Sequence, residues 1–106
     1  MNRGDVYWAD LGSAAGRRPV VILTRDVAIP VLTLVVAAPV TTTVRGIRSE
    51  VQLGPREGLR AECVASCDSL LTVPKQALDP RPVGSLGPDK VMSLDRALRY
   101  ALEIRY

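Results

Sequence analysis

The sequence predicts a small, mainly β domain in which an antiparallel sheet curls into a barrel and a C-terminal α-helix packs against it. The chain of 106 residues has the length of one domain, so we expect residues 1–106 to share a single core. Its hydrophobic content of 47% comes from aliphatic and β-branched residues, without any phenylalanine, which favours a sheet. Several short apolar stretches separated by glycine and proline precede one final stretch with helical periodicity.

Residues 5–11 form the first predicted strand. Val6 and Trp8 alternate there with Tyr7 and with acidic residues. We therefore expect Val6 and Trp8 to face the core and Tyr7 to face solvent. The small residues 12–16 that follow predict a flexible loop.

The second predicted strand runs from Arg18 to Thr24. Pro19 fixes its own φ and disfavours helical geometry at Arg18, so Arg18 begins the strand. The next four residues, 20–23, show no polar alternation, which predicts a strand buried on both faces. A permanent, planar cation is thus held at the start of a rigid strand, where it suits a phosphate. The alternative is an edge arginine bonded to a nearby carboxylate or carbonyl.

Further strands are predicted after a turn that Pro30 closes: residues 32–38, 48–53, 62–68 and 70–73. The 32–38 segment is almost wholly apolar, which favours a central place in the sheet. Residues 39–46 are predicted to leave that strand as a polar loop. This loop carries three consecutive hydroxyl groups: Thr41, Thr42 and Thr43.

The last predicted element is a helix that begins at Gly87, with Pro88 at its first position and Asp89 in its first turn. Apolar residues then recur at helical spacing and predict the face that packs on the sheet. They are Val91, Leu94, Leu98, Ala101 and Leu102.

The distribution of charge indicates an anionic partner. The net charge is only +3, but between Leu11 and Arg48 the single acidic residue is Asp26. The same stretch holds five arginines: Arg17, Arg18, Arg25, Arg45 and Arg48. Nucleic acid is the partner that such a cationic region favours, and a merely solvated basic face is the alternative.

The sequence contains no histidine, and its two cysteines are Cys63 and Cys67. Four residues apart on a strand, the two thiols would lie about 13 Å from each other, too far for a disulfide. Two lone thiols do not make a zinc site, so we expect no metal and no cofactor. Small buried thiols fit a reducing cytoplasm. No signal core and no run of transmembrane length is present, which predicts a soluble protein without membrane contact.

The remaining side chains favour chemistry on RNA. Without histidine there is no imidazole acid or base, and neither a phosphate-binding glycine loop nor a pair of carboxylates at glycosidase spacing is present. An arginine at the start of a strand and a hydroxyl-rich loop can bind a phosphodiester and stabilise extra charge on it. RNA supplies its own nucleophile, the 2′-hydroxyl.

Four blocks of sequence, in this order, resemble the MazF/PemK-like toxin family: RGDVYWADL, RRPVVILTRD, VVAAPVTTT and ECVASCDSLLTVP. The C-terminal amphipathic helix extends the resemblance over nearly the whole chain. It implies an SH3-like barrel of the CcdB/MazF type and a homodimer. It also implies a toxin that cuts single-stranded RNA at short sequences without metal and without the ribosome. A cognate antitoxin would neutralise it and link it indirectly to DNA.

The resemblance also implies roles for particular residues. The catalytic arginine of the family falls on Arg18 and its catalytic threonine or serine on Thr41, with Thr42 as a competing candidate. The products would be a 2′,3′-cyclic phosphate and a 5′-hydroxyl. We assign RNA binding to the neighbouring cations and hydroxyls: Arg17, Arg25, Thr42, Thr43, Arg45 and Arg48.

The chain departs from the family's pattern at two places. The loop before Arg17 is shorter, and Ser69 and Leu71 stand where many members carry glutamine and arginine. Two alternatives stay open: a CcdB-like toxin that grips a protein such as DNA gyrase without chemistry, and a nuclease-dead regulator. Arg18 and the threonine loop favour the nuclease, because a protein binder would not require them.

Overall fold

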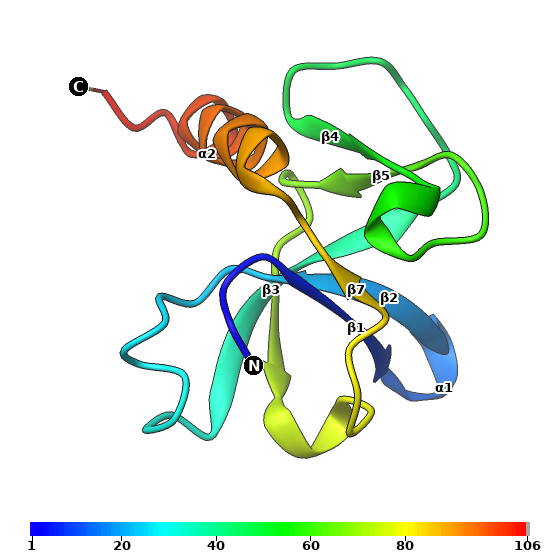
Figure 1. Cartoon of the computed structure of the whole chain (residues 1–106), viewed down its shortest axis with the longest axis vertical. Coiled ribbons are helices and arrows are strands. Elements are labelled where there is room, and N and C mark those ends of the chain that lie inside the picture. Colours follow the sequence, from blue (N-terminus) through cyan, green and yellow to red (C-terminus); the bar gives the residue numbers. More distant parts are fainter. Residues whose placement is uncertain (106) are drawn as a thin grey trace.

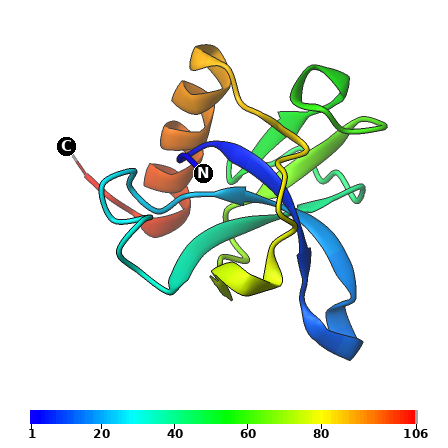
Figure 2. The ribbon, with the colours of Figure 1, turned by 60° about the horizontal axis from the view of Figure 1, so that its bottom comes forward.

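The computed structural model describes residues 1–105 and has the predicted architecture, a curled antiparallel sheet with a helix laid across one end (Figures 1 and 2). The short 3-10 turns are η1 (Pro55–Glu57) and η2 (Lys75–Ala77). The helices are α1 (Gly12–Ala15) and α2 (Pro88–Leu102). The strands are β1 (Asp5–Asp10), β2 (Arg17–Ile22), β3 (Leu34–Thr41), β4 (Glu50–Leu53), β5 (Cys63–Ser66), β6 (Leu71–Pro74) and β7 (Gly84–Ser85).

Strand β3 holds the sheet together. The strands follow the order β4-β5-β3-β2-β1-β7, with β6 also paired to β3. Residues 34–39 of β3 pair with β6 and β2, whereas Val40 and Thr41 pair with β5. One strand therefore belongs to both halves of the curled sheet, which explains why the two halves lie at an angle to each other (Figure 1).

The predicted strand over 32–38 and the loop over 39–46 are wrong in their boundaries. Pro39 lacks an N–H group and reads as a strand end, yet it stays inside β3 opposite Val20. Long-range pairing of the next two residues with β5 carries the strand on to Thr41. The polar loop consequently spans residues 42–49, between β3 and β4.

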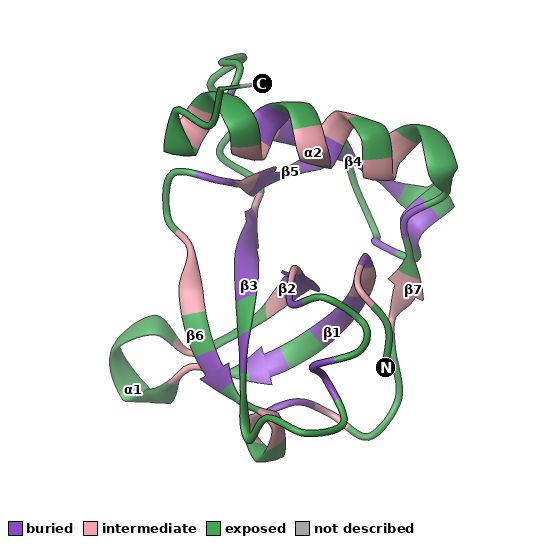
Figure 3. Cartoon of the chain, turned by 90° about the vertical axis from the view of Figure 1, so that its left-hand side faces the viewer, coloured by how far each residue is buried: buried purple, intermediate pink, exposed green. Residues whose placement is uncertain are grey.

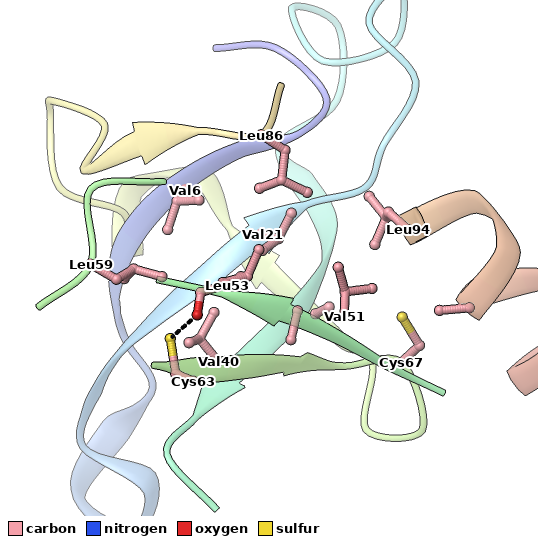
Figure 4. Close-up of a cluster of buried hydrophobic side chains, with 13 residues drawn as sticks. Val6, Val21, Val40, Val51, Leu53, Leu59, Cys63, Cys67, Leu86 and Leu94 are labelled. Atoms are coloured by element: carbon pink, nitrogen blue, oxygen red, sulfur yellow. Dashed lines mark hydrogen bonds between the residues drawn. The ribbon is translucent and has the colours of Figure 1, made fainter. Parts of the chain in front are cut away.

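The prediction that β2 is buried on both faces is confirmed. Val21 belongs to one buried cluster, and Val20 and Ile22 belong to a second cluster on the other side of the sheet. Because the sheet curls, it covers both faces of its central strands. Figure 4 shows the first cluster, in which Val21 lies near Leu94 of α2.

The predicted orientation of β1 is partly wrong. Tyr7 is buried in the second cluster together with Ala9, so the face that was expected to be exposed to solvent is buried. Val6 faces the first cluster as predicted, but Trp8 on the same face leaves 38% of its surface exposed. The alternation rule assumes that one face of the strand is exposed to solvent, but in a curled sheet both faces of a central strand are covered.

Helix α2 begins where the sequence predicts, with Gly87 as its N-cap, Pro88 in its first turn and Asp89 near its N-terminus. It lies across β4 and β5 (Figure 3), and Leu94 and Ala97 are its fully buried residues. Leu102 was predicted to face the sheet but is 53% exposed, because it lies in the last turn, beyond the core cluster.

Smaller differences concern connections. Residues 12–16, predicted as a loop, contain the single-turn helix α1, which the Gly16 N–H closes on the Gly12 carbonyl at 2.7 Å. Strand β7 and the turn η2 carry no periodicity and were not predicted. Cys67 lies just beyond β5, and both cysteines are free and buried.

Two glycines meet where β7 crosses η1. A Cβ atom on Gly84 would collide with the carbonyl oxygen of Glu57, and one on Gly58 would collide with the carbonyl oxygen of Val83. We expect Gly84→Ala to lower the free energy of unfolding by about 2–3 kcal/mol, since backbone cannot yield as a side chain does. Gly87→Ala is the control, because its Cβ would meet nothing within 4 Å. Urea unfolding of both variants measures the difference, and an equal loss in both would contradict this account.

Candidate active site

The sheet register brings Arg18 and Thr41 together. Val20 pairs with Pro39 across the antiparallel strands β2 and β3. Continuing that register by two residues places Arg18, near the start of β2, opposite Thr41, the last residue of β3. Both side chains line one pocket of about 230 Å³, completed by Pro39, Thr43, Arg45, Glu50, Ser66 and Ser69.

The Arg18 guanidinium is available to a ligand. It is exposed, and within residues 1–105 no hydrogen bond or ion pair engages it. Its neighbour Arg17 differs: it pairs with Asp79 at 2.8 Å and lies 5.7 Å above the ring of Trp8. Hydrogen bonding and charge from Asp79 raise the pKa of Arg17 above its ordinary value. The alternative of an edge arginine tied to a carboxylate thus describes Arg17, not Arg18.

The Thr41 hydroxyl group can donate a hydrogen bond to a ligand in the pocket. Its Oγ1 accepts a hydrogen bond from the Thr43 main-chain N–H at 3.1 Å. With that contact made, the Thr41 O–H hydrogen remains free to donate to an anion in the pocket. The same bond fixes the first turn of the 42–49 loop and so sets the direction in which the loop leaves β3.

Apart from Pro39, every residue that lines the pocket is polar or charged. Thr43 and Arg45 reach it from the 42–49 loop, while Ser66 and Ser69 reach it from β5 and the turn that follows. Such a combination of guanidinium groups and hydroxyl donors can hold a phosphate and stabilise extra negative charge on it.

Three polar lining residues were missed by sequence reasoning: Glu50, Ser66 and Ser69. Ser69 was noted only as a departure from the family's pattern. Glu50 and Ser66 reach the pocket because they pair with each other across β4 and β5. The spacing of these two residues in the sequence does not predict that they pair.

A second, mostly apolar pocket of about 200 Å³ adjoins the first and shares Thr41 with it. Its lining includes Trp8, whose exposed ring was predicted to be core, and Thr42, predicted to bind RNA. Pro19, Val40, Leu59, Arg60, Ala61 and Cys63 complete the lining. A polar pocket lined by arginines and hydroxyl groups and an apolar pocket with an exposed aromatic ring thus lie side by side.

Three predicted RNA-binding residues line neither pocket, and of these only Arg17 lies next to one, over the ring of Trp8. Arg25 follows β2 at its far end, seven residues from Arg18 and so up to about 20 Å away along the chain. Arg48 covers the ring of Tyr100 on α2, with its guanidinium carbon 4.4 Å from the ring centre. The arginines of the cationic region are therefore spread over several faces, and only Arg18 and Arg45 share the polar pocket.

The cysteines do not add a reactive group. Burial raises the pKa of Cys67 to about 11, and burial likewise raises the pKa of Cys63. Both thiols therefore stay protonated and unreactive near neutral pH. Among the described residues, no group of three or more histidine, cysteine, aspartate or glutamate side chains is placed to hold a metal ion. None of the helices in residues 1–105 has the length and apolarity to cross a bilayer.

Fold and pocket together define a class: a small SH3-like barrel with a polar, arginine-lined pocket between the start of β2 and the end of β3. The family described as PemK-like, MazF-like toxin of type II toxin-antitoxin system matches residues 2–102. The chain belongs to that family. Endoribonuclease MazF3 of Mycobacterium tuberculosis is 42% identical over 87 residues, which cover 82% of this chain and 84% of MazF3.

Two solved structures have the same fold over their full length. The M. tuberculosis toxin MazF-mt6 superposes with a TM-score of 0.89 at 38% identity, covering 96% of this chain and 99% of the toxin. An endoribonuclease in complex with its cognate antitoxin, from a mycobacterial species, gives 0.87 at 30% identity, covering 100% of this chain and 98% of the other. The sequence-based identification as a MazF/PemK-like endoribonuclease toxin is confirmed, and it is favoured over the CcdB-like alternative.

Proposed function

We propose that the protein cuts single-stranded RNA at a short sequence, without metal, in the pocket that Arg18 and Thr41 share. The observation that carries this proposal is the free Arg18 guanidinium opposite the Thr41 hydroxyl, in a pocket lined by further hydroxyl donors. Those groups are the ones that a phosphodiester needs when it gains negative charge on the way to a pentacovalent phosphorane.

In the proposed reaction the RNA 2′-oxygen bonds to phosphorus and the bond from phosphorus to the 5′-oxygen breaks. The proton of the 2′-hydroxyl passes to water, and the leaving 5′-oxygen takes a proton from solvent. Arg18 stabilises the non-bridging oxygens through its fork of N–H donors, and Thr41 donates one further hydrogen bond. The products are a 2′,3′-cyclic phosphate and a 5′-hydroxyl.

The direct test is incubation of the purified protein with a long RNA in the presence of a chelator, followed by mapping of the ends. We expect cuts at a recurring short sequence, each with a 5′-hydroxyl end and a 2′,3′-cyclic phosphate end. Intact RNA would overturn the proposal and support the CcdB-like alternative, for which binding to a protein such as DNA gyrase is the corresponding assay. Cleavage that the chelator abolishes would overturn the metal-independent step alone.

The apolar pocket beside the cut site suits a nucleobase. Trp8 offers a flat, partly exposed ring, and every base has a face that can stack on it. We expect Trp8→Ala to weaken RNA binding by about 5- to 160-fold, corresponding to about 1–3 kcal/mol for one stacked base. Trp8→Phe should restore most of the affinity. Fluorescence anisotropy with a non-cleavable 2′-deoxy RNA analogue measures both, and unchanged affinity in Trp8→Ala would contradict stacking at this ring.

We propose further that the protein acts as a homodimer. Between residues 27 and 36 five large aliphatic side chains are exposed: Val27, Val31, Leu32, Leu34 and Val36. A groove of about 530 Å³ lies between residues 30–34 and residues 74–76. An apolar surface of this extent is typical of an interface, and a second copy would cover it.

The partner that would control the enzyme is a cognate antitoxin. A relative has been solved in complex with its cognate antitoxin. The net charge of +3 and the free Arg18 favour an acidic segment that orders along the polar pocket and competes with RNA. Contact with DNA would then be indirect, through the antitoxin complex. RNA as substrate and two free buried thiols fit the cytoplasm.

A further inference from the structure

The carboxylate of Glu50 grips the loop that carries Thr43 and Arg45. Its Oε1 accepts hydrogen bonds from the main-chain N–H groups of Arg45 at 3.1 Å and Gly46 at 3.0 Å, and its Oε2 lies 3.4 Å from the Arg45 nitrogen. Gly46 has φ of 69°, the left-handed region that glycine favours, so the chain reverses where the carboxylate holds it. Glu50 also lines the polar pocket itself.

Residues 42–46, the part of the 42–49 loop that reaches the pocket, have few other contacts. Every residue from 42 to 48 is exposed, so hydrophobic packing does not fix the course of the loop. Residues 42–46 are anchored by the Thr41 hydroxyl at the β3 end and by the Glu50 carboxylate. Nearer β4, the Ile47 carbonyl accepts a hydrogen bond from the Glu50 N–H at 3.1 Å, and Arg48 lies over Tyr100. Ser49, the one buried loop residue, bonds Asp68 and lies beyond the part that reaches the pocket.

Glu50 stands on a rigid support. It is the first residue of β4 and pairs with Ser66 of β5, and the next inward residues, Val51 and Leu53, are buried in the core beneath α2 (Figures 3 and 4). Because β4 is fixed in the sheet, the hydrogen bonds that Glu50 accepts also fix the position of the loop relative to the sheet. This is the kind of support that keeps a binding group in productive geometry.

The contacts argue against Glu50 as the proton acceptor in the reaction. Two main-chain amide donors already occupy one carboxylate oxygen, so that oxygen faces the loop and not the 2′-hydroxyl of a bound RNA. Within residues 1–105, no ion pair joins Glu50 to Arg18 or Arg45. Both guanidinium groups therefore remain available to phosphate although a carboxylate lies in the same pocket.

From this geometry we infer that Glu50 is a positioning residue: its carboxylate holds the 42–49 loop so that Arg45 and Thr43 face the phosphate beside Arg18. The inference rests on the proposed RNA cleavage at this pocket. It adds a residue that touches no reacting atom and acts through the main chain of the loop.

Glu50→Gln and Glu50→Ala separate positioning from base catalysis. The carbonyl oxygen of glutamine can accept both loop N–H groups but is a far weaker base than the carboxylate. We expect Glu50→Gln to keep cleavage within about threefold of the wild type, and Glu50→Ala to lower kcat/KM by about 10- to 100-fold through misplacement of the loop. Glu62→Ala is the matched control, because Glu62 lines neither of the two pockets.

Two further measurements fix the interpretation. Arg45→Ala should lower kcat/KM in the wild type but have no more than about a twofold effect in the Glu50→Ala background, because the lost grip already misplaces Arg45. Amide hydrogen exchange at Arg45 and Gly46 should accelerate in Glu50→Ala and not in Glu50→Gln, independently of any RNA.

The outcomes distinguish the inference from the proposed function. Glu50→Gln as inactive as Glu50→Ala, with loss of a pH-dependent limb, would overturn positioning and make Glu50 the base. Unchanged activity or unchanged amide exchange in Glu50→Ala would overturn the inference. A wild-type protein that cuts no RNA, with faster exchange in Glu50→Ala, would instead leave the grip on the loop standing and refute the proposed function.

Discussion

Arg18→Ala is expected to lower the rate of RNA cleavage by about 10²–10³-fold while the protein stays folded, since one preorganised charge contact in the transition state has that value. Arg18 is exposed and its guanidinium is unpaired among the described residues, so its truncation breaks no hydrogen bond or ion pair. Single-turnover cleavage of a short RNA containing the mapped site gives the rate, and urea unfolding checks the fold. A folded Arg18→Ala protein with near wild-type cleavage would refute the assignment.

Two companion variants sharpen the Arg18 test. Arg18→Lys should also cleave poorly, because an ammonium group is a point charge and cannot reproduce the bidentate fork. Arg17→Ala removes the neighbouring guanidinium, which is already engaged by Asp79 and Trp8. Its effect should fall mainly on RNA affinity and be much smaller than that of Arg18→Ala. The reverse order would move the catalytic role to Arg17.

Local sequence signals predicted those features that a short stretch of residues determines by itself. The unbroken apolar run after Pro19 predicted the doubly buried β2, and Gly87-Pro88-Asp89 predicted the start of α2. Arg18 was placed at the start of its strand for the same reason, since proline acts on its immediate neighbour.

Features that depend on the curl of the sheet were not predictable in this way. Trp8 looks like a core residue by alternation, but it is 38% exposed, whereas its neighbours Tyr7 and Ala9 on the other face of β1 are buried. Thr41 falls inside β3 only because its strand crosses from one half of the sheet to the other. The lining of the pocket by Glu50, Ser66 and Ser69 likewise follows from the pairing of β4 with β5, which leaves no mark on sequence spacing.

The distribution of the arginines shows a second limit. Arg25 and Arg48 lie in the same cationic stretch as Arg18, and net charge alone does not separate them. Their contacts and their places in the fold separate them from Arg18. Arg48 packs against Tyr100, and Arg25 lies beyond the far end of β2. A role for these two in RNA binding stays a prediction, and it concerns other faces of the molecule than the pocket.

The absence of histidine shapes the expected pH dependence. No imidazole can give the bell-shaped profile near pH 6–7 that a histidine pair produces, and guanidinium groups in proteins do not act as bases. We therefore expect the rate to rise smoothly with pH as more of the 2′-hydroxyl loses its proton to water or hydroxide. A clear acidic limb near pH 6–7 would instead indicate a carboxylate acting as base, and Glu50 is the carboxylate that lines the pocket.

Thr41→Val should lower the cleavage rate by about 10- to 100-fold with little loss of RNA affinity, because valine keeps the shape but removes the hydroxyl donor. Valine also removes the acceptor for the Thr43 N–H, so part of the loss could come from the loop. Thr41→Ser resolves this: serine keeps both hydrogen bonds and should retain much of the activity. Thr42→Val tests the competing candidate, whose side chain lines the apolar pocket. A Thr41→Val enzyme as active as the wild type, beside an impaired Thr42→Val, would transfer the catalytic hydroxyl to Thr42.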